Sequence, residues 1–440
     1  MKKIEFSADK LVKRLLGLPE KFQVSILDSC GVNYLDSKYL IAGIEPRETF
    51  CLSDENPQNT LDFLDKKLSD KNYFNIFTIS YDFGLKLENL KPREKEFQTI
   101  AEPDVYLAVY DVLIFHDYNS NETFLIGNEK KFEDILSELE KSSLNFANLT
   151  DEKSTVLSNF SKKEYLRTIE TIQEHIRRGD TYQTNLTQQF RAKLPNSITA
   201  EKIFWRLRKD NPAPFAAFIR REKDTVVSTS PERFFRIEKN NIQTSPIKGT
   251  RPRGKNPSED EKLKNELLTS AKDRAENTMI VDLLRNDFGR VCKFGSVAVE
   301  KLCDLETHPT FFHLVSTVSG QLKTDVKFSE ILKAVFPCGS ITGAPKIRTM
   351  QIIDQLETAN HGLSMGAVGF SIQNSKIKIQ NSIDLNVAIR TMIVKNQEAI
   401  FNVGGGILID SIPENEYEEM LIKAKAIFRA INADVNDLPK

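Results

Sequence analysis

The chain has 440 residues, of which 40% are hydrophobic, and its formal net charge is -1. This length can bury a large core, and the balanced charge argues against nucleic-acid binding, which needs concentrated positive charge. No apolar run approaches the roughly 18 residues that span a bilayer, and the N-terminus lacks the apolar core of a signal peptide. The five cysteines form no C-x-x-C pair, which predicts reduced thiols in a cytoplasmic protein without membrane or nucleic-acid partners.

The first 150 residues alternate short apolar runs with polar breaks, a pattern typical of strands and turns. Strands are expected at residues 22–28, 39–43 and 105–116, and a helix at residues 132–142. A polar stretch follows at residues 143–159 and indicates a boundary. The sequence therefore predicts an N-terminal region at residues 1–150 and a second region at residues 160–432.

The second region begins with apolar residues at helical spacing, which predict an amphipathic helix at residues 162–178. Strands are then expected at 183–192, 215–219 and 226–230, β-rich stretches at 295–322 and 366–407, and helices at 270–285, after Pro345 and at 417–431. The strands come in runs without regular helical crossovers. This order favours an α+β fold with antiparallel sheets over a doubly wound parallel sheet.

Carboxylates on two of the predicted helices are candidates for metal binding. Glu416, Glu419 and Lys423 share one helix face and could hold Mg2+ with an anionic substrate, or they could form a solvated face with a Glu419–Lys423 pair. Glu276 lies on a partly apolar face, where a carboxylate costs desolvation unless it is paired or metal-bound. Mg2+ takes one or two carboxylates and keeps waters, so Glu276 and Glu419 predict a Mg2+ site, with a surface role as the alternative.

Other candidates are weaker when taken singly. The small-residue segment 339–346 runs into a helix whose free N–H groups could bind a carboxylate. Gly404–Gly406 would let the backbone approach a ligand, or would form a bulged turn. His313 in a strand-like run is more often a core residue. Lys248 follows Ile247 in a tight segment and is either a desolvated nucleophile or a surface lysine at a strand end.

Eight motifs follow one another between residues 161 and 430, at 230–233, 246–254, 273–277, 280–287, 313–316, 339–346, 404–407 and 416–423. Together they resemble the chorismate-binding enzymes, which include the anthranilate, aminodeoxychorismate, isochorismate and salicylate synthases. The N-terminal third is similar to the corresponding region of the amine-adding members. The resemblance implies two facing antiparallel β-sheets wrapped by helices, with the active site in the C-terminal part.

The resemblance also implies roles for particular residues. Glu276 and Glu419 would ligate Mg2+, with Glu416 close by, and the metal would bind the ring carboxylate of chorismate. Glu232 would be the general acid that protonates the leaving hydroxyl. The other residues expected at the substrate are Lys423, Gly404, Gly405 and Gly406 at the ring carboxylate, Arg390 at the enolpyruvyl carboxylate, Gly249, Thr250, Ser340 and Lys346 in the pocket, and His313 as a catalytic residue near the leaving hydroxyl.

Two positions distinguish the reactions within the family. Gln183 stands where the water-adding relatives have a lysine base, and an amide has no basic lone pair, which implies an amine product. Lys248 stands where anthranilate synthases usually have alanine. It implies that Lys248 adds to ring C2 as the C4 hydroxyl leaves, before ammonia adds at C4. Mg2+ and Arg390 are expected to keep Lys248 neutral.

The remaining implications concern ligands and partners. A tryptophan site would include Ser29, Pro214 and Phe215, and Phe370 in place of the usual tyrosine would remove one hydroxyl contact to the substrate. Ammonia is expected from a separate glutamine amidotransferase subunit, for a product that leads to 4-aminobenzoate and folate. The alternatives are an anthranilate synthase large subunit and a non-catalytic protein that binds chorismate or tryptophan.

Overall fold

The computed structural model describes residues 1–32, 34–35, 37–97, 100–144, 152–307, 311–373, 382–435 and 438. The strands among these residues form two antiparallel sheets, a larger one of 12 strands and a smaller one of 10. The larger sheet contains, in spatial order, β1 (Lys2–Ile4), β8 (Glu122–Gly127), β7 (Val112–Asp117), β3 (Tyr39–Gly43), β2 (Ser25–Asp28), β11 (Phe215–Arg220), β12 (Thr225–Ser230), β21 (Thr391–Lys395), β22 (Glu398–Ile407), β10 (Gln183–Lys193) and β18 (Gly343–Ala344), with β9 (Thr155–Ser158) also beside β10.

The smaller sheet lies against the larger one. Its strands, in spatial order, are β15 (Ile247–Pro252), β17 (Phe311–Gln321), β14 (Asn241–Thr244), β13 (Arg233–Glu238), β20 (Ser382–Val387), β19 (Ala367–Ile372), β5 (Phe74–Ile79), β6 (Val105–Tyr110) and β4 (Glu48–Leu52), with β16 (Ala298–Thr307) also beside β17. Apolar residues from both sheets, such as Ile76 and Ile219, form the core between them.

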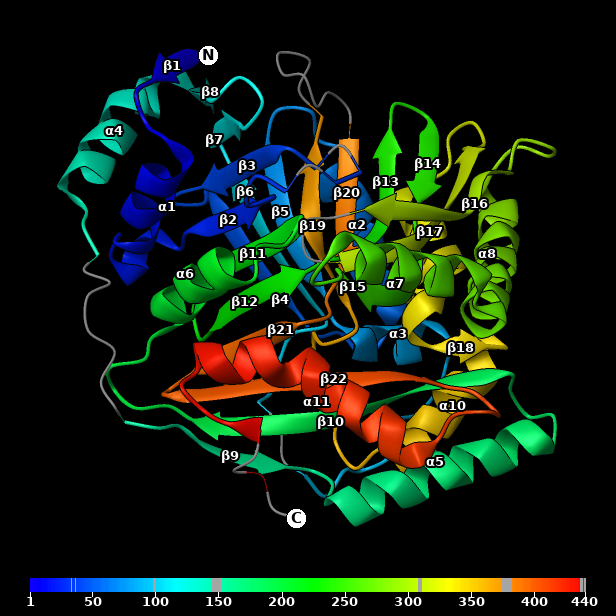
Figure 1. The fold of residues 1–440 in the computed structure, drawn as a ribbon. Helices are drawn as coiled ribbons and strands as arrows, with labels where there is room; N and C mark the ends of the chain where they lie inside the picture. The colour runs from blue at the N-terminus through cyan, green and yellow to red at the C-terminus, as the bar shows by residue number, and fades with distance from the viewer. Residues whose placement is uncertain are drawn as a thin grey trace.

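Helices cover the outer faces of both sheets (Figure 1). The larger sheet packs against α1 (Ala8–Leu16), α4 (Phe132–Lys141), α5 (Lys162–Arg177), α6 (Ala200–Asp210) and α11 (Pro413–Ala430). The smaller sheet packs against α2 (Pro57–Leu68), α3 (Tyr81–Leu87), α8 (Ala271–Val291) and α9 (Phe328–Val335), while α7 (Pro257–Thr269) contacts β15 and β17, and α10 (Lys346–Leu356) contacts β10 and β18. The predicted α+β class with two facing antiparallel sheets is therefore confirmed.

Helix α5 shows how local sequence sets an element. Its first turn is closed by a capping box, in which Ser161 and Glu164 satisfy each other's backbone N–H groups. Tyr165, Ile169 and Ile172 lie on one face and are fully buried against the larger sheet. Helical spacing of apolar residues was therefore a sufficient signal for this helix.

The structure differs from the predicted elements at several places. Residues 105–116 were predicted as one strand, but β6 and β7 belong to different sheets and Asp111 separates them. Both strands are buried on each face, so no alternation of apolar and polar residues marks the change of sheet. Helix α8 continues to Val291 and α11 begins at Pro413, both beyond the expected limits.

Strands from both predicted regions pair within each sheet. Ile26 of β2 lies opposite Phe218 of β11 in the larger sheet, and Ile76 of β5 lies opposite Phe370 of β19 in the smaller one. The division into residues 1–150 and 160–432 stays a prediction, and residues 145–151 of the expected boundary lie outside the described residues. Within the described part of the chain, no helix has the length and apolar character needed to cross a membrane.

Candidate active site

Lys248 lies on β15, in a part of the strand that bulges. The pairing register with β17 shifts between Ile247 and Thr250, and Gly249 has a φ of +84°. A Cβ atom on Gly249 would lie 3.0 Å from side-chain atoms of Asp273 and Leu267, so a larger residue would be both strained and crowded. The bulge thus accounts for the glycine that follows the lysine.

The ammonium group of Lys248 lies between α8 and the segment at residue 340, and its side chain is 13% exposed. Its Nζ lies 2.9 Å from Oε1 of Glu276 and donates a hydrogen bond of 3.2 Å to the backbone oxygen of Ser340. Burial lowers the pKa of Lys248, but the carboxylate of Glu276 outweighs burial and holds that pKa above its ordinary value. A neutral Lys248, as expected from the sequence, therefore requires another cation to compensate Glu276.

Glu276 also binds Gln183 from the first residue of β10. The Nε2 group of Gln183 donates to Oε1 of Glu276 at 2.9 Å. A Cβ atom on Gly406 would lie 2.0 Å from Gln183 Nε2 and 3.3 Å from Glu276 Oε1. Gly406 is therefore required for this arrangement, because any side chain there would displace the Gln183 amide.

Glu232 lies between β12 and β13 and is only 7% exposed. The hydroxyl of Ser340 donates to its Oε1 at 2.7 Å. Burial raises the pKa of Glu232, and the hydrogen bond from Ser340 and the charges of Lys248 and Lys423 only partly offset this. The direction agrees with a carboxyl group that keeps its proton to a higher pH than an exposed glutamate.

The acidic residues of α11 approach the same place. Lys423 Nζ lies 2.8 Å from Glu419 and donates to the backbone oxygen of Gly404 at 3.1 Å. Glu416 accepts a hydrogen bond of 2.7 Å from Ser411, and burial raises its pKa. Burial and the negative charge of Glu276 act to raise the pKa of Glu419. The positive charge of Lys423 beside it outweighs them, so that the pKa of Glu419 is lowered.

Glu276 and Glu419 are the carboxylates that this site offers to a Mg2+ ion. Among the described residues, no three His, Cys, Asp or Glu side chains are grouped closely enough to hold a metal ion. Mg2+ needs only one or two protein carboxylates, and Glu276 and Glu419 come from different helices and lie within each other's electrostatic influence. The donor set therefore suits a Mg2+ ion that keeps several waters and is completed by a substrate carboxylate.

Lys272 is a cation at this site that sequence reasoning missed. It lies 3.8 Å from Glu416, and its charge acts on both Glu276 and Glu419. The sequence did hold a signal for Lys272. It lies one helical turn before Glu276, and residues four apart share a helix face.

Arg390 has no hydrogen bond or ion pair from its guanidinium among the described residues. It follows β20 with a left-handed φ of 49°, and burial lowers its pKa. A largely buried cation without a protein partner is costly. Arg390 is therefore suited to an anionic ligand.

Several predicted residues have other partners. Thr250 is exposed, and its hydroxyl lies 2.8 Å from Nδ1 of His313 on β17. Lys346 forms a buried ion pair with Asp287 of α8, at 2.8 Å, and donates to a backbone oxygen at Val335. The substrate contacts expected of Thr250, His313 and Lys346 stay predictions.

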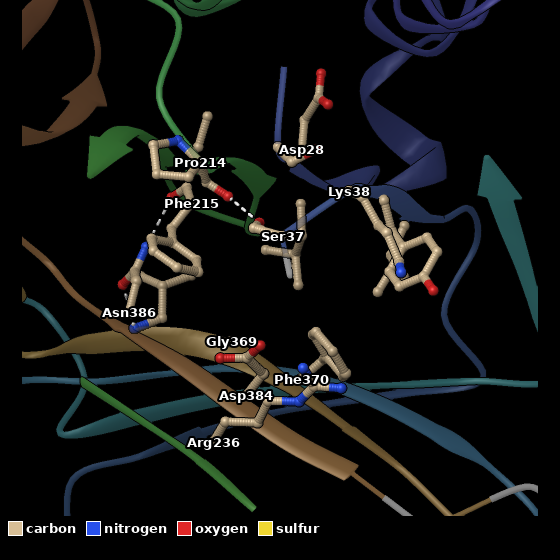
Figure 2. Close-up of a pocket in the computed structure, with 16 residues that line it drawn as sticks. Asp28, Ser37, Lys38, Pro214, Phe215, Arg236, Gly369, Phe370, Asp384 and Asn386 are labelled. Atoms are coloured by element: carbon tan, nitrogen blue, oxygen red, sulfur yellow. Dashed lines mark hydrogen bonds between the residues drawn. The ribbon is translucent and has the colours of Figure 1, made fainter. Parts of the chain in front are cut away.

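The residues of the predicted tryptophan site line a cavity between the two sheets. Ser29, Pro214, Phe215 and Phe370 all contribute to the wall of this cavity. Figure 2 shows Pro214 and Phe215 facing Phe370 across the hollow. The structure thus places Phe370 in this cavity, whereas the sequence led us to expect a missing contact at the chorismate site.

Comparisons with known proteins agree with this arrangement. Residues 29–429 match the chorismate binding enzyme family. The chain is 38% identical over 356 residues to aminodeoxychorismate synthase component 1 of Escherichia coli (strain K12), covering 80% of this chain and 75% of that protein. It is 36% identical over 355 residues to anthranilate synthase component 1 of Aquifex aeolicus, and this match covers 77% of this chain and 70% of that protein.

Longer relatives and solved structures extend the comparison. Aminodeoxychorismate synthase of Arabidopsis thaliana is 38% identical over 330 residues, but the chain spans only 35% of its length. The structure of anthranilate synthase component I from Streptococcus pneumoniae has a TM-score of 0.79 and 29% identity, covering 90% of this chain and 94% of that one. Because the family match includes Glu232, Lys248, Glu276 and Glu419, the chain belongs to the family of chorismate-binding enzymes.

Proposed function

We propose that the protein aminates chorismate at C4 with ammonia, giving 4-amino-4-deoxychorismate, a precursor of 4-aminobenzoate and folate. The observation that carries this proposal is the placement of Lys248, which is largely buried and in contact with Glu276 and with the Ser340 segment that binds Glu232. Lys248 and Glu232, the proposed nucleophile and general acid, thus come to one site from separate segments of the chain. Relatives named aminodeoxychorismate synthase component 1 support the assignment.

Chorismate carries two carboxylates, and the site offers two separate positions for them. Arg390, whose guanidinium has no partner in the described part of the chain, is suited to bind the enolpyruvyl carboxylate bidentately. Lys423 and the backbone of Gly404–Gly406 lie beside Glu276 and Glu419 and would receive the ring carboxylate. Mg2+ held by Glu276 and Glu419 would supply positive charge there and compensate the carboxylate that otherwise keeps Lys248 protonated.

The proposed reaction has two displacements. The neutral Nζ of Lys248 forms a bond to ring C2, the two ring double bonds shift, and the C4 hydroxyl leaves as water with a proton from Glu232. Ammonia then forms a bond to C4, the double bonds shift back, and the C2–N bond breaks to release Lys248 as a free amine. One difficult displacement is thereby divided into two easier ones.

Gln183 supports ammonia rather than water as the second nucleophile. Its amide cannot take a proton from water, and ammonia needs no such base. We propose that a separate glutamine amidotransferase subunit supplies the ammonia, in line with the name component 1 of the bacterial relatives.

The second candidate is amination at C2 to give anthranilate, which the relative named anthranilate synthase component 1 favours. Lys248 argues against it, because its amine would occupy the approach to C2. Mass spectrometry of the product formed from chorismate, Mg2+ and ammonium chloride decides between them. Aminodeoxychorismate is the expected product; anthranilate would replace the proposal, and unchanged chorismate would reject amination.

A further inference from the structure

Behind the glycine segment Gly404–Gly406 lies a buried ion pair that the proposed reaction does not use. Glu357 follows α10, and Nε2 of His361 lies 2.6 Å from its Oε2. Their side chains are 2% and 5% exposed. A buried charged pair of this kind needs a reason, since apolar residues of similar volume would cost less desolvation.

The carboxylate of Glu357 binds the middle of β10. It accepts the backbone N–H of Thr187 at 2.7 Å and the hydroxyl of Thr187 at 3.0 Å. On this side β10 pairs with β18 at residues 183–184 and with β9 at residues 190–193, and no described strand pairs with the residues between. Glu357 thus satisfies a strand N–H that would otherwise be unpaired.

Thr187 connects this carboxylate to the substrate side. In the register of β10 and β22, Thr187 lies directly opposite Gly404, and Asn402 donates to the Thr187 hydroxyl at 3.3 Å. Gly404 is itself close-packed on β10, because a Cβ atom there would lie 1.9 Å from the backbone oxygen of Leu186. The position of the glycine segment therefore follows the position of β10 at Thr187.

We propose that Glu357 is a positioning residue for the glycine segment that receives the ring carboxylate of chorismate, and that Glu357 is held in place by protonated His361. This inference rests on the proposed function. Glu357 does not touch the substrate but acts through Thr187 and Gly404.

Other groups around His361 favour its charged form. Asp82 of α3 accepts the backbone N–H groups of His361 and Gly362, and the ring of Tyr81 stacks on the imidazole with centroids 4.3 Å apart. Lys95 opposes the charge, but it is paired with Asp354 at 2.9 Å. Burial lowers the pKa of His361, yet Glu357 and then Asp82 outweigh burial and Lys95 and raise that pKa above 6.5.

The sign of the pH dependence follows from this direction. A histidine whose pKa is raised by folding stabilises the folded arrangement below its unfolded value and loses that contribution as pH rises through the folded value. Chorismate binding should therefore weaken on the alkaline side of His361 titration, because the ion pair that fixes Glu357 is lost. An arginine at this position would keep its charge throughout.

The test measures the dissociation constant of chorismate with Mg2+ from about pH 6 to about pH 9, a range that begins near the ordinary pKa of histidine and extends well above it. Glu357→Gln and His361→Gln should weaken binding about tenfold at the acidic end, the order expected when a buried charge-assisted hydrogen bond is lost. His361→Arg should bind as the wild type does at the acidic end and more tightly at the alkaline end.

Asn159→Ala is the matched control, because Asn159 accepts the N–H of Gln189 on the same edge of β10 at 2.8 Å. It should leave chorismate binding nearly unchanged. Equal weakening by Asn159→Ala would overturn the proposal in favour of a general loss of strand order. So would wild-type binding by Glu357→Gln, or identical pH profiles for His361→Arg and the wild type.

Amide exchange provides a readout that does not depend on chorismate. The Thr187 amide should exchange faster in Glu357→Gln than in the wild type at the same pH, while the Gln189 amide stays protected. Unchanged protection of Thr187 would also overturn the proposal. If the wild type fails to bind chorismate but Thr187 responds as expected, the proposed function fails and the contact of Glu357 with β10 stands.

Discussion

At the scale of single residues, the charge of Lys248 depends on which cation Glu276 binds. In the structure Glu276 is the partner of Lys248, and the pKa of the lysine is raised. A Mg2+ ion at Glu276 and Glu419 would compensate the same carboxylate. Metal binding and nucleophile activation are therefore expected to be linked through one carboxylate oxygen.

The covalent role of Lys248 gives the sharpest prediction. Lys248→Ala should lower the rate of aminodeoxychorismate formation on the order of a thousandfold, because a covalent step is removed. Lys248→Arg is the matched control, since it keeps a cation beside Glu276 but cannot add to C2. Lys248→Arg should retain the fold but show the same loss in the rate of aminodeoxychorismate formation. Given chorismate without ammonia, the wild type should accumulate a mass adduct on the peptide with Lys248, and wild-type turnover by Lys248→Ala would exclude this nucleophile.

Glu232 predicts an alkaline limb in the pH–rate profile. Its raised pKa means that the acid form persists above the ordinary value of 4.5 and is lost as pH rises further. Glu232→Gln should reduce turnover by about 10²–10⁴-fold and remove that limb, as expected for a general acid. Single-turnover rates measured across pH at constant free ammonia test this. If the alkaline limb of the pH–rate profile persists in Glu232→Gln, the titration of another group causes it.

Much of the site could be named from the sequence, but not its contacts. The family resemblance pointed to Lys248, Glu276, Gln183 and Glu232, which come from separate elements and meet only in the fold. The spacing along the chain carries no information on which carboxylate pairs with which amine. Lys272 was missed for this reason, since its approach to Glu416 joins residues of α8 and α11 that lie far apart in the sequence.

At the scale of elements, α8 and α11 each contribute one carboxylate to the proposed metal site. We expect EDTA to abolish activity and Mg2+ to restore it. Glu276→Gln and Glu419→Gln should each weaken binding of both Mg2+ and chorismate, because the ion would bridge protein and substrate carboxylates. Calorimetric titration with Mg2+ measures this, and unchanged affinity in both variants would remove the metal assignment.

Strand β22 offers a second prediction at this scale. Gly406→Ala places a Cβ atom 2.0 Å from Gln183 Nε2, whereas Gly405→Ala places one 3.2 Å from Lys423 Nζ and 3.8 Å from Glu416 Oε2, which are the ends of two side chains. Gly406→Ala should therefore raise the KM for chorismate about tenfold or more, and Gly405→Ala should have a smaller effect. Steady-state kinetics of the two variants provides the comparison. If the two variants raise the KM equally, the glycines serve to let the backbone approach the substrate, and the contact of Gly406 with Gln183 is not what matters.

The elements themselves were predicted well where one face is buried and less well elsewhere. The spacing of Tyr165, Ile169 and Ile172 located α5 almost to the residue. The strands at residues 105–116 could not be separated, because both faces of β6 and β7 are apolar. A change of sheet at Asp111 is decided by long-range pairing, which a single sequence does not record.

At the scale of the whole molecule, one buried ion pair joins the two predicted regions. Arg208 of α6 lies 2.7 Å from Asp28 of β2, and both side chains are at most 5% exposed. Arg208→Ala leaves a buried carboxylate without this partner and should lower the free energy of unfolding by about 3–5 kcal/mol. Urea denaturation measures the change. Lys209→Ala is the control, because Lys209 pairs with Asp9 at the surface and should cost less than about 1 kcal/mol.

The mixed order of strands in both sheets has a consequence for synthesis. Strand β2 cannot pair with β11 until nearly two hundred further residues have been made, and β10 cannot pair with β22 until synthesis has passed Ile407. Neither sheet can close until its last strands, β22 in the larger sheet and β20 in the smaller one, have been synthesised. The nascent protein therefore exposes apolar strands such as β6 and β7 for most of its synthesis, and its yield in the cell should depend more on chaperones and growth temperature than its final stability would suggest.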